Sequence, residues 1–190
     1  MEVVLLSGGI ESVTLLYDRA QNAPVTAVFI DYGQRAAHQE QKAATTNAQA
    51  VGCRLLALNI RSVGAALAPQ GVLTAHVPLP ARNLVAISLA ANVALQLKAS
   101  SVCIGLQRDD QAHREGGPAF IQALTCALKV FDLALETPYA HLSKACVVAH
   151  GRALGVDYDK TYSCLLGHVR ACGRCAQCRA RQDALQDARR

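Results

Sequence analysis

The sequence contains few aromatic and few charged residues. It contains no tryptophan, three phenylalanines and five tyrosines among 190 residues, and only 17% of its residues are charged. So few aromatic side chains argue against a stacking platform for single-stranded nucleic acid. The 52% of hydrophobic residues excludes an intrinsically disordered chain and favours one heavily buried unit with a large core.

Long apolar runs are also absent. No stretch approaches the roughly 18 uninterrupted apolar residues of a membrane-spanning helix, so we expect no membrane partner. The chain enters a strand-like run at once, without a basic segment and cleavage site. We therefore expect a cytoplasmic protein.

Two common nucleotide-binding signatures are missing as well. The chain contains neither GxxxxGK[ST] nor GxGxxG, which disfavours a Walker-type NTPase and an ordinary dinucleotide-binding enzyme. What the sequence does contain is a series of short apolar runs that suit strands buried on both faces. They lie at 2–7, 24–31, 53–60, 100–106 and 133–139.

Helical patterns alternate with these runs. They cover 10–21, 36–52, 81–99, 118–131 and 143–155. Right-handed crossovers between parallel strands then predict an α/β fold, a Rossmann-like, doubly wound parallel sheet of about five strands. Residues 61–80 carry glycine and three prolines and predict an irregular excursion. Residues 107–117 are polar and end in glycine, which is typical of an active-site loop.

The chain has eight cysteines, and their spacing divides them into two groups. Cys53, Cys103, Cys126 and Cys146 are scattered in apolar surroundings, so we expect each to be a small buried hydrophobic residue. The other four are clustered, and without a secretory signal such a cluster indicates a metal site.

The clustered cysteines are Cys164, Cys172, Cys175 and Cys178, in a C-x7-C-x2-C-x2-C pattern. Four thiolates at this spacing suit a tetrahedral zinc ion, and four protein ligands close the site, so we expect structural Zn²⁺. An iron–sulfur cluster also accepts four cysteines and is left open. The arginines near the cluster would favour thiolates, and His168 is a weaker candidate ligand.

The first strand-like run leads into "SGGIES", residues 7–12. Gly8 and Gly9 allow a sharp turn and a close approach to an anion, while amides at the following helix start favour negative charge. Ser7 and Ser12 add hydroxyl groups. The position after the first strand of an open α/β sheet predicts a phosphate-binding loop.

This loop resembles the SGGxDS signature of the PP-loop ATP pyrophosphatases, with Glu11 in place of the family's aspartate. The resemblance implies that ATP binds here and is split to AMP and pyrophosphate. The longer carboxylate of Glu11 still suits Mg²⁺ near the phosphates, with a changed reach.

The loop and the cysteine pattern together resemble the QueC family of 7-cyano-7-deazaguanine synthases. Further similar stretches are "DYGQR" (31–35), "ARNLVAISLAA" (81–91), "FIQALTCAL" (120–128), "ETP" (136–138), "SKA" (143–145) and "TYSC" (161–164). The resemblance implies a PP-loop nucleotide-binding domain over 1–155 and a zinc-binding helical lobe over 156–190.

By this resemblance the protein is an ATP-dependent, AMP-forming ligase of C–N bonds. It would adenylate the carboxylate of 7-carboxy-7-deazaguanine and convert it with ammonia to an amide and then a nitrile. The expected partners are ATP, Mg²⁺, Zn²⁺ and a deazapurine-like molecule, with a homodimer left open.

The resemblance also assigns residues. Catalytic positions are Lys144, Arg82 and Asp110. Nucleotide-binding positions are Leu6, Ser7, Gly8, Gly9, Ile10, Glu11, Ser12, Asp31, Tyr32, Gly33, Gln34 and Asn83.

The sequence departs from the family where a substrate would sit. The loop after the fourth strand loses the family's YPDCR portion, and Ala36 and Ala81 replace a histidine and a glycine. These changes leave two alternatives open. One is a related ligase that joins the deazaguanine acyl group to a protein or other amine, as QueC-like proteins in anti-phage systems suggest. The other is a deazaguanine-binding protein without turnover. A tRNA-modifying enzyme is a third, weaker alternative, supported by the basic C-terminus.

Overall fold

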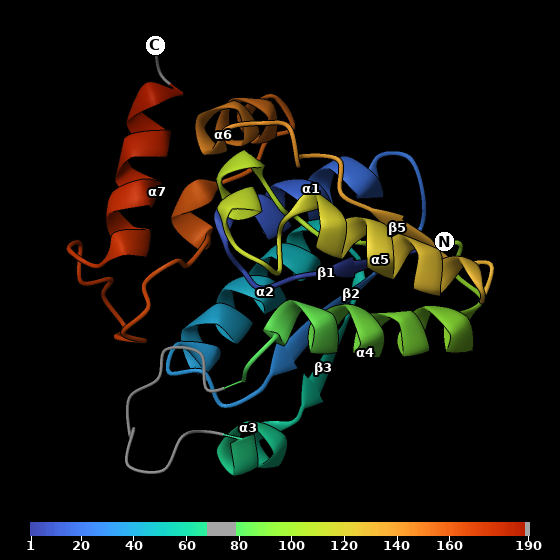
Figure 1. The fold of residues 1–190 in the computed structure, drawn as a ribbon. Helices are drawn as coiled ribbons and strands as arrows, with labels where there is room; N and C mark the ends of the chain where they lie inside the picture. The colour runs from blue at the N-terminus through green and yellow to red at the C-terminus, as the bar shows by residue number, and fades with distance from the viewer. Residues whose placement is uncertain (68–78, 189–190) are drawn as a thin grey trace.

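A five-stranded parallel sheet forms the centre of the protein, in a computed structural model that describes residues 1–67 and 79–188 (Figure 1). The strand order is β3-β2-β1-β4-β5, and every neighbouring pair is parallel. The strands are β1 (Glu2–Leu5), β2 (Val25–Asp31), β3 (Arg54–Asn59), β4 (Ser101–Cys103) and β5 (Ala134–Glu136).

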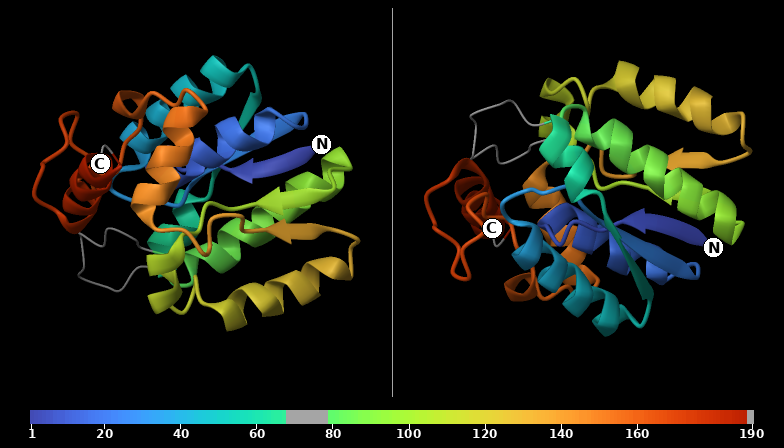
Figure 2. Two further views of the ribbon diagram at one scale, coloured as in Figure 1. Left: turned by 90° about the horizontal axis from the view of Figure 1, so that it is seen from above. Right: turned by 90° about the horizontal axis from the view of Figure 1, so that it is seen from below.

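Helices cover both faces of this sheet (Figure 2). Helices α1 (Ile10–Ala20), α2 (Ala37–Val51), α6 (Lys144–Ala153) and α7 (Ala176–Asp187) contribute to one core cluster. Helices α4 (Arg82–Leu97) and α5 (Pro118–Lys129) contribute to the other. Three short helices complete the described chain: α3 (Arg61–Leu67), η1 (Arg108–Ala112) and η2 (Tyr158–Lys160).

The central strands are apolar on both sides because both of their faces are buried. On β1, Val4 packs in the cluster with α1 and α6, whereas Val3 and Leu5 pack in the cluster with α4 and α5. Phe29 and Val28 of β2 divide in the same way. Successive side chains point to opposite faces, and both faces are buried. The apolar runs in the sequence are therefore continuous and do not alternate with polar residues.

The predicted fold class is confirmed, and so are two details of its helices. Gly52 ends α2 with a left-handed backbone (φ 76°), and Pro118 begins α5. The prediction of an irregular stretch over 61–80 is wrong for its first part, which forms α3. The side chain of Asn59 accepts the Arg61 N–H and starts that helix. Residues 68–78 of that predicted excursion lie outside the described residues.

Two of the scattered cysteines also differ from prediction. Cys103 is buried and Cys53 is half-buried, but Cys126 and Cys146 are exposed. Both exposed residues lie on helices, α5 and α6. Successive side chains of a helix are rotated by about 100° around its axis, so an apolar neighbour can be buried while the cysteine faces solvent.

The sheet places a crevice at the carboxyl end of β1. The chain moves outward from β1 to β2 and β3 and then returns to place β4 on the other side of β1. Such a change of direction between neighbouring strands is where open α/β sheets bind ligands. None of the described helices is both long and apolar enough to cross a bilayer.

Candidate functional site

A cavity of about 720 Å³ lies at the carboxyl ends of the strands. Its walls come from the phosphate loop (residues 7–12), the end of β2, the N-terminus of α4, the loop 104–113 and the start of α6. Tyr162 and one face of α7 close another side. Segments far apart in the sequence therefore meet at the edge that the fold class predicts.

The phosphate loop is held by its own hydroxyl groups. Ser12 Oγ accepts the Ser7 N–H at 3.2 Å and donates to the Gly9 carbonyl at 3.2 Å, and the two serine hydroxyls lie 3.0 Å apart. Gly9 precedes α1, and in the described chain no side chain caps this helix. The first amides of α1 are thus left for an anion, as in other helix-terminal phosphate sites.

Two glycines permit the close packing around this loop. Gly8 has φ +80°, and a Cβ there would lie 2.5 Å from the Glu40 carbonyl oxygen. Gly105, just after β4, passes so close to α1 that a Cβ would lie 2.9 Å from the Glu11 carbonyl carbon. Any side chain at either position would push the loop away from its supports.

Glu11 and Lys144 form an ion pair across the cavity, with Lys144 Nζ 3.0 Å from Glu11 Oε1. Their side chains are 18% and 14% exposed, so the pair is largely removed from solvent. Glu11 lies in the first turn of α1, where the helix dipole favours an anion. Lys144 is the first residue of α6, where the dipole disfavours a cation, and Glu11 offsets that cost.

The N-terminus of α4 presents Arg82 and Asn83 to the cavity. Glu115, from the loop before α5, accepts the Asn83 backbone N–H at 2.9 Å, and its carbonyl accepts the Asn83 side-chain amide at 2.9 Å. Ala81 precedes the helix with a left-handed backbone, φ 48°. This is the position where the QueC pattern has glycine, and Glu115 holds the helix start that alanine strains.

Tyr32, Gln34 and Glu40 form the wall next to β2. Gln34 Nε2 donates to Glu40 Oε2 at 3.0 Å and to the Ile30 carbonyl at 3.2 Å. Burial raises the pKa of Glu40 above its usual range, and the hydrogen bond from Gln34 opposes this only in part. Burial also raises the pKa of Tyr32, against the lowering effect of Arg82.

The polar loop after β4 is more ordered than its composition suggests. It contains η1, and Gln107 and Asp110 cap each other: Asp110 Oδ2 accepts the Gln107 N–H, and Gln107 Oε1 accepts the Asp109 N–H. A second hollow of about 350 Å³ lies between this loop and α4, lined in part by Arg82, Asn83 and Asp110.

Most of the predicted site residues line the main cavity. These are Leu6, Ser7, Gly9, Glu11, Ser12, Tyr32, Gln34, Arg82, Asn83, Asp110 and Lys144. Gly8 and Gly33 are turn residues with positive φ, Ile10 is fully buried in the core, and Asp31 pairs with Arg61 at 2.9 Å. The roles assigned to all of these residues stay predictions.

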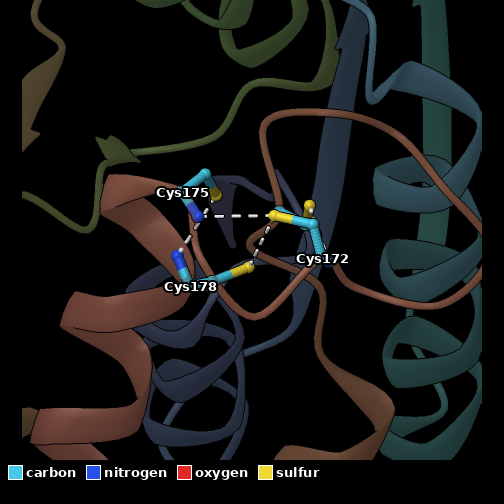
Figure 3. Close-up of side chains that lie close together, drawn as sticks. Cys172, Cys175 and Cys178 are labelled. Atoms are coloured by element: carbon cyan, nitrogen blue, oxygen red, sulfur yellow. Dashed lines mark hydrogen bonds between the residues drawn. The ribbon is translucent and has the colours of Figure 1, made fainter.

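The four clustered cysteines converge, as their spacing predicts. Their Sγ atoms all lie within 4.8 Å of one another, and Cys172 Sγ is 3.9 Å from Cys178 Sγ (Figure 3). Backbone N–H groups point at the sulfurs: Cys172 N at Cys164, Cys175 N at Cys172, and Cys178 N at Cys175, each at 3.4 Å. Such donors stabilise thiolates, the form that binds metal.

Backbone amides lower the pKa of Cys172 to about 6, with the Arg174 N–H as the largest cause and the Cys175 N–H next. The sequence suggested guanidinium groups for this effect, but the peptide backbone supplies it. Four sulfurs around a single ion at zinc–sulfur distances would be about 3.8 Å apart. The cluster therefore fits a single metal ion after a small contraction.

The sequence analysis assigned no role at the site to four residues that the structure places there: Glu40, Gly105, Glu115 and Tyr162. Their signals were weak. Gly105 follows a strand as Gly8 does, which hinted at a second close approach. Glu40 and Glu115 lie in polar stretches where only the tertiary structure distinguishes a cavity-lining carboxylate from a surface one.

The comparisons with known proteins agree with this geometry. Residues 1–189 match the family "Queuosine biosynthesis protein QueC". The chain belongs to the QueC family. A relative from Methanoregula boonei is named 7-cyano-7-deazaguanine synthase and is 34% identical over 210 residues, which cover 98% of this chain and 94% of the relative. A relative of the same name from Alcanivorax borkumensis is 36% identical over 213 residues, again covering 98% and 94%.

Solved structures with lower sequence similarity share the fold. The U34-tRNA thiolase NcsA from Methanococcus maripaludis, solved with its [4Fe-4S] cluster, has a TM-score of 0.60 at 16% identity. The alignment covers 98% of this QueC-family chain and 65% of the thiolase. NMN synthetase from Francisella tularensis has a TM-score of 0.57 at 17% identity, covering 90% and 70%. These similarities concern the fold alone.

Proposed function

We propose that this QueC-family protein is an ATP-dependent enzyme that adenylates the carboxylate of 7-carboxy-7-deazaguanine and converts it to the amide and nitrile. The observation that carries the proposal is the cavity in which the phosphate loop faces Lys144, Arg82 and Asn83. Family membership over nearly the whole chain supports the same reaction.

The nucleotide half of the cavity has the parts that ATP needs. The phosphates would lie on the amides of residues 8–10, with Lys144 within reach because it already contacts Glu11 of the same turn. Among the described residues, six carboxylates line the cavity against the two cations Arg82 and Lys144: Glu11, Glu40, Asp109, Asp110, Asp183 and Asp187. This excess of negative charge favours ATP that enters with a divalent cation, and Mg²⁺ prefers such oxygen ligands.

The chemistry is leaving-group activation. A carboxylate oxygen leaves poorly, whereas AMP leaves well from an acyl adenylate, so ammonia can then form the amide. In the second round, ATP activates the amide oxygen for loss as AMP. The residues of the chain would orient the two reactants and stabilise phosphate charge, with Lys144 and Arg82 as the cations that strengthen their contacts in the transition state.

We assign the four-cysteine cluster to structural Zn²⁺. Close sulfurs with backbone N–H donors suit a single tetrahedral ion better than a multi-iron cluster, which would hold its four ligand sulfurs farther apart. Four protein ligands leave no open position for chemistry. We also propose that residues 156–190 form the metal-binding segment and residues 1–155 the nucleotide-binding domain, in a cytoplasmic enzyme.

The test is to incubate the purified protein with ATP and 7-carboxy-7-deazaguanine, with and without ammonium, and to follow AMP and deazaguanine products by mass spectrometry. We expect AMP release and the nitrile only when both substrates and ammonium are present. Binding of ATP without AMP release would contradict the proposal and would favour a binding protein without turnover.

A second candidate, acyl transfer to a larger amine, is favoured by one observation. The hollow of about 350 Å³ beside Arg82 and Asn83 adjoins the main cavity and is far larger than ammonia needs. In the same incubation, AMP release without nitrile, together with a mass added to a protein or other amine, would select this candidate.

A further inference from the structure

Residues 161–164, called here the connecting segment, run between the phosphate loop and the cysteine cluster and contact both. The Tyr162 N–H donates to the Gly8 carbonyl at 2.8 Å, which ties the segment to the phosphate loop. The Tyr162 hydroxyl donates to the His168 carbonyl at 2.8 Å, inside the loop between Cys164 and Cys172. Tyr162 therefore bridges the two regions through its backbone and its side chain.

Arg181 of α7 holds the same segment from the other side. Its guanidinium donates to Thr161 Oγ1 and to the Tyr158 carbonyl, each at 2.5 Å. Arg181 lies three residues after Cys178, and Thr161 lies three residues before Cys164. The Arg181–Thr161 hydrogen bond therefore joins the same two chain segments that Cys164 and Cys178 bring together.

The guanidinium of Arg181 is partly buried, and burial disfavours its positive charge. Burial lowers its pKa below the ordinary value, although Asp159 and other nearby anions oppose this. A partly buried guanidinium is retained at a desolvation cost, which its hydrogen bonds to Thr161 Oγ1 and the Tyr158 carbonyl offset. Arg179, two residues earlier on α7, is exposed, and its side chain makes no hydrogen bond within the described part of the chain.

A third contact joins the cluster to the nucleotide-binding region. Gly167 has φ +70°, and a Cβ there would lie 2.3 Å from the Arg35 carbonyl oxygen. The loop between Cys164 and Cys172 therefore rests directly on the turn that follows β2. Gln34 of that turn lines the cavity.

From these contacts we propose that Arg181 is a positioning residue that couples metal binding at the four cysteines to nucleotide binding at the phosphate loop. A bound ion draws Cys164 and Cys178 together and fixes Thr161 against Arg181. That in turn fixes the Tyr162 N–H on the Gly8 carbonyl. A loop already ordered loses less conformational entropy when it binds phosphate, so affinity rises. The inference rests on the part of the proposed function that places ATP at residues 7–12.

Linkage requires the effect to be reciprocal: if the ion strengthens ATP binding, ATP must strengthen ion binding by the same factor. The decisive comparison uses zinc-loaded full-length protein in three forms: unchanged, Arg181→Met and Arg179→Met. All keep the four cysteines. ATP affinity is measured by calorimetry, and zinc affinity is measured by competition with a chromogenic chelator, with and without ATP.

We expect ATP to raise zinc affinity about tenfold in the unchanged protein and in Arg179→Met, a typical coupling. In Arg181→Met, ATP should change zinc affinity less than twofold, and ATP affinity should fall about tenfold although zinc is bound. If Arg181→Met fails to fold, Thr161→Val removes the same hydrogen-bond acceptor with nearly the same shape and should reduce the coupling.

Equal effects of ATP on zinc affinity in Arg181→Met and Arg179→Met would overturn the inference while leaving the proposed function intact. A protein that takes up no zinc would overturn the inference and the zinc assignment but not the proposed reaction. If the unchanged zinc-loaded protein binds no ATP, the proposed function is wrong and the inference falls with it. In a protein that binds ATP, faster amide exchange of residues 7–12 without zinc supports the inference, and unchanged exchange overturns it.

Discussion

The phosphate loop and the cysteine cluster lie next to each other but are stabilised in different ways. The phosphate loop is backed by Leu6, Ile10 and Val13, all at most 1% exposed, and its turn is determined by close packing at Gly8 and Gly105. The loop between Cys164 and Cys172 packs closely on Arg35 at Gly167, but none of residues 165–171 is buried, and Val169 is 83% exposed. We therefore expect the core to form the first region before any ligand binds, and the second region to depend on a bound ion.

The largest expected effect tests this dependence of the cluster. Cys178→Ser removes one of four ligands, and loss of a structural metal site is among the few single changes that cost more than about 4 kcal/mol. We expect the variant to bind less than one zinc per chain and to melt roughly 10 °C lower. Metal content and thermal unfolding measure this.

Cys126→Ser is the matched control, because Cys126 is exposed on α5, away from the cluster. Its zinc content and melting temperature should equal those of the unchanged protein. If Cys178→Ser behaved like this control, the cluster would be stable without its ion, and the contrast with the phosphate loop would disappear.

The next effect tests whether packing forms the phosphate loop. Gly8→Ala combines a left-handed backbone with contacts at 2.5 Å to the Glu40 carbonyl and 3.0 Å to Ala43 Cβ. We expect a loss of about 3 kcal/mol in the free energy of unfolding, the sum of backbone strain and overpacking. Chemical denaturation measures it, and calorimetry should show weakened ATP binding.

Gly52→Ala separates the two causes. Gly52 has nearly the same backbone, φ +76°, but nothing lies within 4 Å of its would-be Cβ. It should lose only about 1 kcal/mol, the strain alone. Equal losses at both positions would show that packing around Gly8 contributes nothing.

A third effect concerns chemistry rather than folding. Lys144→Met removes the cation that Glu11 holds beside the phosphate loop. We expect a fall in kcat of about 100-fold for AMP formation, typical of losing one charge-stabilising group. The control is Lys160→Met, since Lys160 is an exposed lysine paired with Asp157. A normal kcat in Lys144→Met would exclude Lys144 from the transition state.

The smallest effect is a gain in stability. Because burial raises the folded pKa of Glu40, its charged form destabilises the folded protein above that pKa, and the cost is absent below the ordinary value of 4.5. Glu40→Gln, which can still accept the Gln34 hydrogen bond, should therefore gain about 0.5 kcal/mol at neutral pH. The gain should vanish near pH 4. A gain that persists at low pH would contradict an electrostatic cause.

Sequence patterns predicted most of the sheet and its phosphate loop because those features are local. Apolar runs of strand length, helical periodicity and paired glycines each reflect contacts within a few residues. The pattern misled at 61–67, where the glycines and prolines of residues 61–80 were taken to indicate an irregular stretch although Asn59 starts a helix there. It also misled at Cys126 and Cys146, because local composition does not say which way a helix faces.

The sequence by itself determined the family, the strand–turn–helix that forms the phosphate loop, and the four cysteines of the candidate metal site, since spacing alone allows CxxC thiolates to converge. Only the tertiary structure decided what lies between them. Tyr162, Arg181 and Gly167 join the cluster to residues 8 and 35, and Glu115 supports α4 from 32 residues away. These contacts link positions far apart in the chain, so they depend on how the whole sheet brings its loops together.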